Sequence, residues 1–272
     1  MIKVITGNEA AAYGVMLAQP DVMTAYPITP ASRISEQISE FYAQGLLKGT
    51  FVNVESEMTS LSIVTGASQA GVRVFTATSA QGLAWMHEGL HWASGSRLPI
   101  VLCDVNRPLA APWNLTCGQI DTLSQRDTTW MQLYCESNQE VIDTMLQAYR
   151  IAEAMYLPLM VCLDGVYLSY IAETVDIPEQ KLVDKYLPAY DPTGRARLGQ
   201  AQVGVVGGIV DLAVIDVAAE APAVTQLPRR EVGPVVDRCG PFPGGHHLEV
   251  FRERVHGSRR QRIGFHRRRD PR

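Results

Sequence analysis

The chain has 272 residues, of which 46% are hydrophobic, and a formal net charge of −4. This length and composition suit one large or two smaller globular domains. No apolar run approaches the ~20 residues of a membrane span, and the first ten residues lack the basic and apolar segments of a secretory signal. We therefore expect a cytoplasmic protein without a membrane anchor.

Strand-like and helix-like patterns alternate over the first two-thirds of the chain. Helices are expected at 7–18, 32–45, 56–71, 79–95 and 138–155, and strands at 22–26, 51–55, 72–78, 99–105 and 157–165. Thr6 is a candidate N-cap for the first helix, and Ser137 with Glu140 has the spacing of a capping box. Repeated strand–helix units predict an α/β fold, a doubly wound and mainly parallel sheet with helices on both faces.

Polar loops follow four of the expected strands. They are Tyr26–Ser32, Glu55–Glu57, Thr78–Gly82 and Asn106–Arg107. Ligands of such sheets bind beyond the carboxyl ends of the strands, so we expect the four loops to form one site.

Three residues in these loops are candidates for chemistry. Glu57 begins a helix, where a carboxylate could be catalytic or could only stabilise the helix dipole. Arg107 ends a buried strand, where it could bind a substrate carboxylate or form an ion pair within the protein. Thr29 lies between Pro27 and Pro30 in a loop that either presents a hydroxyl or is simply a rigid turn.

Other polar residues carry weaker signals. Thr78 and Ser79 precede a helix, where small polar residues can bind anions or act as caps. His87 and His91 are spaced to bind zinc, but no third ligand is evident, so we predict a packed or surface pair and no metal site. None of the five cysteines forms a C-x-x-C motif, which favours buried thiols over an iron–sulfur cluster or zinc ribbon.

The charge is distributed unevenly along the chain. Residues 1–193 contain 20 acidic and 10 basic side chains, whereas residues 194–272 contain 8 acidic side chains and 14 arginines. From Pro228 onward there is neither a helical stripe nor strand alternation. The tail could be a basic arm for nucleic acid, but it contains only three phenylalanines, Phe242, Phe251 and Phe265, and no tyrosine or tryptophan to stack bases. We expect residues 194–272 to be a degenerate or truncated segment. Within it, we expect residues 228–272 to be disordered or to be read in a shifted frame.

Six ordered motifs between about residues 3 and 190 carry a resemblance to a known family. They are YPITPAS, ESEMTSLSIVTGAS, TATSAQGLAWMHEGL, LPIVLCDVNRPLAAP, RDTTWMQLYCESNQEVIDTMLQAYRIAE and LPLMVCLDG. The chain resembles the alpha subunit of the 2-oxoacid:ferredoxin oxidoreductases, the family of pyruvate synthase. These enzymes oxidatively decarboxylate a 2-oxoacid to an acyl-CoA and pass the electrons to ferredoxin.

The resemblance implies a thiamine pyrophosphate site shared between subunits, with residues 1–193 as its pyrimidine-binding domain. Glu57 matches the glutamate that hydrogen-bonds the pyrimidine ring, and Thr29 and Arg107 match residues that contact the substrate carboxylate. Pro27, Ile28, Thr78 and Ser79 belong to the cofactor-binding motifs, and we take them as cofactor-binding residues.

The implied partners are beta, gamma and delta-type subunits, ferredoxin and coenzyme A. The diphosphate, its Mg²⁺ and the iron–sulfur clusters are expected on those partner subunits.

Two departures from the family pattern leave alternatives open. The stretch WNLTCGQID keeps Asp121 but lacks a histidine usual in pyruvate enzymes, and Trp113 adds bulk, so other 2-oxoacids are candidates. The C-terminal segment departs from the further α/β domain of the family. The alternative function is therefore a non-catalytic, truncated remnant that folds but does not assemble.

Overall fold

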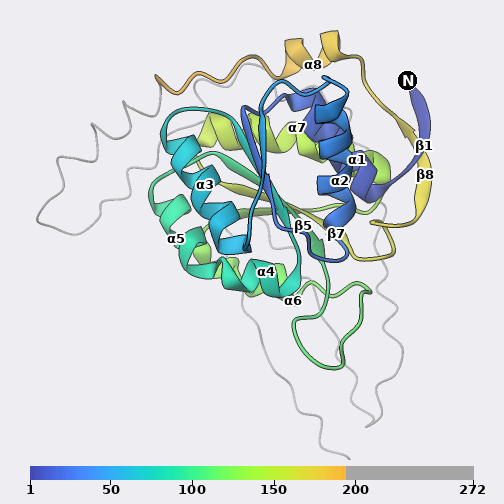
Figure 1. Cartoon of the computed structure of the whole chain (residues 1–272), viewed down its shortest axis with the longest axis vertical. Coiled ribbons are helices and arrows are strands. Elements are labelled where there is room, and N and C mark those ends of the chain that lie inside the picture. The colour runs from blue at the N-terminus through green and yellow to red at the C-terminus, as the bar shows by residue number, and fades with distance from the viewer. Residues whose placement is uncertain (194–272) are drawn as a thin grey trace, which may run out of the picture. The chain divides into compact units, whose positions relative to one another are not determined.

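The computed structural model describes residues 1–193, and the predictions for residues 194–272 lie outside this range. A six-stranded parallel sheet with the order β3-β2-β4-β5-β7-β6 forms the centre of the domain (Figure 1). In chain order the elements are β1 (Ile2–Thr6), α1 (Gly7–Ala18), β2 (Val22–Ala25), α2 (Ser32–Ala43), β3 (Thr50–Asn53), α3 (Glu57–Gln69), β4 (Val74–Thr78), α4 (Ala80–Trp85), α5 (His87–Gly95), β5 (Ile100–Asn106), α6 (Ile120–Leu123), the 3₁₀ turn η1 (Arg126–Thr128), β6 (Met131–Tyr134), α7 (Asn138–Met155), β7 (Leu159–Asp164), β8 (Ala172–Asp176) and α8 (Gln180–Tyr186).

Helices cover both faces of the sheet, as the strand–helix alternation predicted. Along β5, Val101 and Cys103 pack into one hydrophobic cluster with α1, α2 and α7, whereas Ile100 and Leu102 pack into a second with α3, α4 and α5. Successive side chains of a strand point to opposite faces, so a strand covered on both faces needs apolar side chains on both of them. This arrangement explains the apolar run from Ile100 to Cys103, which precedes the buried polar residues Asp104 and Asn106 at the end of β5.

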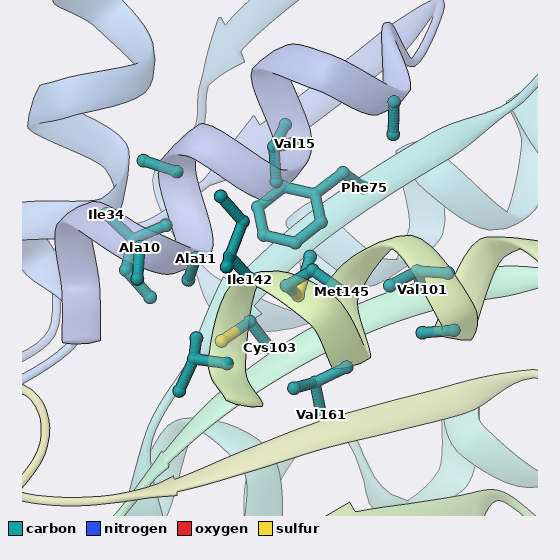
Figure 2. Close-up of a cluster of buried hydrophobic side chains, with 14 of the residues drawn as sticks. Ala10, Ala11, Val15, Ile34, Phe75, Val101, Cys103, Ile142, Met145 and Val161 are labelled. Carbon is teal, nitrogen blue, oxygen red and sulfur yellow. The ribbon is translucent and has the colours of Figure 1, made fainter. Parts of the chain in front are cut away.

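Figure 2 shows the first of these clusters, where Phe75 from β4 lies between Val15 of α1 and Met145 of α7. The two helices approach closely at Gly14. A Cβ atom on Gly14 would lie 2.5 Å from the Cβ of Met145. Glycine at this position therefore permits the contact between α1 and α7 that closes this face of the core.

The expected N-caps are present, with one difference. Thr6 and Glu9 form a complete capping box at the start of α1. At α7 the Ser137 hydroxyl accepts from the amide of Glu140 (3.2 Å), but the Glu140 carboxylate accepts from the amide of Glu136 instead of Ser137. The prediction of an N-cap was right, and the reciprocal bond of a capping box is replaced by one to the preceding residue.

Some elements differ from the predictions. The expected helix 79–95 is divided into α4 and α5 at Met86, whose N–H is shared between the carbonyls of Gly82 and Leu83. The strands β1, β6 and β8 were not predicted. The strands β1 and β8 pair with each other as a separate antiparallel ribbon, so β7 is not the last strand.

A row of buried hydroxyls joins α3 to the sheet. The hydroxyl of Ser60 lies 2.7 Å from that of Thr24 on β2 and 2.8 Å from that of Thr76 on β4. All three side chains are fully or almost fully buried. Because buried hydroxyls need partners, this row fixes the position of α3 on the sheet more narrowly than apolar packing alone would.

Two further expectations concern membrane-spanning helices and the state of the cysteines. None of the helices between residues 1 and 193 is long and apolar enough to cross a membrane. The four cysteines of this range are free thiols, and three of them, Cys103, Cys135 and Cys162, are buried, as their apolar sequence neighbours indicated.

Candidate cofactor and substrate site

The predicted polar loops come together at one edge of the sheet. The strands β3, β2, β4 and β5 are consecutive neighbours and parallel, so their carboxyl ends lie side by side. The loops at Tyr26–Ser32, Glu55–Glu57, Thr78–Gly82 and Asn106–Arg107 follow these four ends. This is the edge at which open parallel sheets bind ligands.

Glu57 is the first residue of α3, after the N-cap Ser56. Its side chain is only 5% exposed, and within residues 1–193 its carboxylate accepts no hydrogen bond and forms no ion pair. Glu55, by contrast, is exposed and accepts a hydrogen bond from Thr59 (2.6 Å). The two carboxylates therefore occupy different surroundings, and only that of Glu57 is buried without a partner.

The first turn of α4 lies against Glu57. A Cβ atom on Gly82 would lie 2.4 Å from Thr78 Oγ1, 2.7 Å from Glu57 Oε1 and 2.8 Å from Glu57 Cγ. The Thr78 hydroxyl is buried and has no hydrogen-bond partner among the described residues. Glu57 and Thr78 thus present two unpartnered polar groups side by side, and the absence of a side chain at Gly82 makes room for them.

Of the two predicted helix-start residues, only Thr78 has a free hydroxyl. The Ser79 hydroxyl donates to the carbonyl of Val105 on β5 (2.6 Å) and is fully buried. Its role in this structure is to join the ends of β4 and β5. The prediction that Ser79 contacts a cofactor stays untested.

Arg107 is half-buried and forms no ion pair within residues 1–193. Its Nη2 donates to Gln81 Oε1 (3.0 Å), and its Nε has no partner. Since Gln81 precedes Gly82, the first turn of α4 links Arg107 to the Glu57–Thr78 pair. A cation held by a neutral amide keeps its charge available for an anion, so the alternative of an internal ion pair is not what the structure shows.

The proline loop lies at the same edge. The buried side chain of Asn8 donates to the carbonyl of Pro30 (2.8 Å) and so fixes the loop to the start of α1. Thr29 and Pro27 are exposed, and Ile28 packs against the core. No hydrogen bond joins Thr29 to Glu57 or Arg107 in the described residues.

Asp121 is the residue that the sequence patterns left without a role. Its carboxylate is fully buried and accepts from the amides of Ala80 (3.2 Å) and Arg107 (3.0 Å) and from Asn106 Nδ2 (2.9 Å). It thereby holds together the ends of β4 and β5. Burial and the nearby Asp121 carboxylate raise the pKa of Asp104 well above its usual value.

The Gly82→Ala substitution tests this arrangement. We expect it to lower the free energy of unfolding by about 1–3 kcal/mol, because the added methyl overlaps atoms of Glu57 and Thr78 that have little room to move. Gly66→Ala is the matched control, since a Cβ at this position in α3 meets nothing within 4 Å. Helix propensity predicts that the control gains about 0.5–1 kcal/mol. Urea unfolding of both variants measures the difference, and equal stabilities would show that the space at Gly82 is not required.

The parallel sheet, the buried glutamate at a helix start and the glycine beside it define a cofactor-binding α/β domain. The family model described as pyruvate flavodoxin/ferredoxin oxidoreductase, thiamine diphosphate-binding, matches residues 13–215. The chain belongs to this family of thiamine diphosphate-binding domains.

Curated relatives and a solved structure agree with this assignment. Over 190 residues the chain is 53% identical to ketoisovalerate oxidoreductase subunit VorA of Pyrococcus abyssi, covering 70% of this chain and 48% of the relative. It is 50% identical over 194 residues to pyruvate synthase subunit PorA of Methanothermobacter thermautotrophicus, covering 71% and 51%. The chain therefore spans about half the length of these curated relatives.

The solved structure is the 2-oxoglutarate:ferredoxin oxidoreductase of Magnetococcus marinus, determined with 2-oxoglutarate, coenzyme A and succinyl-CoA bound. It is 28% identical to this chain with a TM-score of 0.61, and the match covers 66% of this chain and 32% of that one.

Proposed function

We propose that this chain supplies the pyrimidine side of the thiamine diphosphate site in the alpha subunit of a 2-oxoacid:ferredoxin oxidoreductase. The reaction is the oxidative decarboxylation of a 2-oxoacid, pyruvate or a related acid, to an acyl-CoA, with the electrons passed to ferredoxin. The observation that carries the proposal is the buried Glu57 carboxylate, which has no partner within residues 1–193. Such a group needs a hydrogen-bond donor, and an aminopyrimidine offers one.

When bound, thiamine diphosphate supplies the carbon nucleophile and the electron sink for decarboxylation. Glu57 holds the pyrimidine ring by a hydrogen bond and controls the proton on its ring nitrogen. Thr78 offers the second unpartnered polar atom of the cleft, and Gly82 leaves the space that the ring needs. The proposed cofactor-binding residues also include Pro27 and Ile28 in the loop Tyr26–Ser32 and Ser79 in the loop Thr78–Gly82.

Arg107 and Thr29 bind the substrate carboxylate in this proposal. A guanidinium held by Gln81, without an acidic partner, can form a charge-assisted pair with a carboxylate. The ketoisovalerate and pyruvate relatives and the 2-oxoglutarate-bound structure all act on or bind acids with a 2-oxo carboxylate. That shared group is the one that Arg107 and Thr29 recognise, so the proposal specifies this class of acid.

The partners are beta, gamma and delta-type subunits of one cytoplasmic complex. The beta subunit contributes the diphosphate and Mg²⁺ side of the cofactor site, and the iron–sulfur clusters lie on partner subunits. The names of the relatives as subunits support a multi-subunit assembly.

Co-expression of the full chain with these partners tests the proposal. We expect a stable complex that reduces ferredoxin only when thiamine diphosphate, coenzyme A and a 2-oxoacid are all present. Pyruvate, 2-oxoisovalerate and 2-oxoglutarate assayed in parallel identify the preferred acid. A chain that purifies alone, without cofactor and without effect on its partners, would instead support the non-catalytic remnant.

A further inference from the structure

A second group of polar side chains lies away from the thiamine site, on the outer side of α5. His87 and His91 come from this helix and Asp127 from η1, and one ligand atom from each lies within 4.8 Å of the others. The i, i+4 spacing places both imidazoles on one face of α5. The third ligand, which the sequence did not reveal, is brought to them by the fold.

Gln125 orients the imidazole ring of His87. The His87 Nδ1 lies 2.6 Å from Gln125 Oε1, and Gln125 Nε2 donates to the carbonyl of Asp121 (3.3 Å). Because the amide nitrogen of Gln125 is used in this way, its oxygen faces His87 and accepts a hydrogen bond from Nδ1–H. The lone pair of His87 is then on Nε2. A histidine oriented by a hydrogen bond at its other nitrogen is the usual arrangement around a protein-bound metal.

The other two ligands have no competing partners. Within residues 1–193 the Asp127 carboxylate accepts no hydrogen bond and forms no ion pair. Among the same residues, the His91 ring makes only an edge-on contact with the His87 ring, with centroids 5.0 Å apart. His91 and Asp127 are exposed, and His87 is half-buried.

We propose that His87, His91 and Asp127 form a binding site for a divalent transition metal, with Zn²⁺ as the best match. Two imidazoles and one carboxylate suit Zn²⁺, which leaves a fourth position for water. Ligand atoms around tetrahedral zinc lie about 3.3 Å apart. The exposed side chains need only small rotations to close to that spacing.

The site would tie α5 to the segment that carries Gln125 and Asp121. Asp121 holds the amides of Ala80 and Arg107 at the thiamine site. A metal on the outer face therefore stabilises the backbone that supports the catalytic edge without touching the cofactor. This inference concerns metal binding and is independent of the proposed oxidoreductase activity.

Calorimetric titration of the full chain with Zn²⁺, with Co²⁺ absorption as a second readout, tests the site. We expect one tight site per chain, a tetrahedral Co²⁺ spectrum and a raised melting temperature. His91→Gln and Asp127→Asn should each weaken binding about tenfold or more, and both residues are exposed, so folding is preserved.

The matched control is the double variant His246→Gln and His247→Gln, which alters the other closely spaced histidines of the chain. It should retain the site. The proposal is overturned if the wild-type chain binds no Zn²⁺, if His91→Gln and Asp127→Asn bind as tightly as wild type, or if the control variant alone abolishes binding.

Discussion

Glu57→Gln should reduce 2-oxoacid-dependent ferredoxin reduction by about 10²–10⁴-fold in the reconstituted complex. A glutamine keeps the shape of the side chain beside Gly82 and Thr78 but cannot exchange a proton with the cofactor ring. Proton transfer by a positioned side chain contributes a factor of this size. Initial rates of ferredoxin reduction at saturating cofactor measure the effect.

Glu55→Gln is the control, because Glu55 is exposed and its only side-chain partner within residues 1–193 is Thr59. It should retain nearly the wild-type rate. The unfolding free energy of both variants separates catalysis from folding. A Glu57→Gln complex that folds, assembles and works within a few-fold of wild type would show that this carboxylate is not the catalytic group.

Arg73→Met should destabilise the domain by about 3–5 kcal/mol, a large part of the stability of a typical fold. Arg73 is 7% exposed and binds both carboxylate oxygens of Glu153 on α7 (2.5 and 2.9 Å). It also donates to the carbonyls of Ala18 at the end of α1 and Pro188 after α8. The substitution leaves the Glu153 carboxylate, which is only 14% exposed, without its partner. Thermal and urea unfolding give the free energy directly.

Arg33→Met gives the comparison. Arg33 contacts a similar number of acceptors, among them Glu9, Glu36 and Glu40, but its side chain is 35% exposed. Exposed ion pairs contribute about 0–1 kcal/mol. If both arginine variants lost the same stability, burial would not be what makes the Arg73 network strong.

The elements that the sequence predicted are those whose local pattern is complete. The strand β5 is buried on both faces and is apolar from Ile100 to Cys103, and Ile34, Ile38 and Phe41 mark the buried stripe of α2. The strand β6 has only half-buried or exposed residues, which leaves little pattern to detect. The strands β1 and β8 pair across more than 160 residues, and no local signal encodes such a pairing.

The residues of the candidate site also fall into those that the sequence predicted and those that it did not. Strand ends followed by polar residues predicted the positions of Glu57, Thr29 and Arg107, because the topology of a parallel sheet brings these ends together. The support from Asp121 and the third ligand at Asp127 could not be predicted. Both lie in short elements after β5, and their contacts depend on how this crossover returns along α4 and α5.

The row of hydroxyls from Thr24 through Ser60 to Thr76 has a consequence for how the domain can change over time. A purely apolar interface allows a helix to shift along its axis, whereas paired hydrogen-bond donors and acceptors allow only one position along that axis. Ser60 is one turn after Glu57. The aliphatic neighbours of α3 can therefore be exchanged during evolution while the Glu57 carboxylate keeps its position. Replacing Ser60 would displace that carboxylate before the fold itself failed.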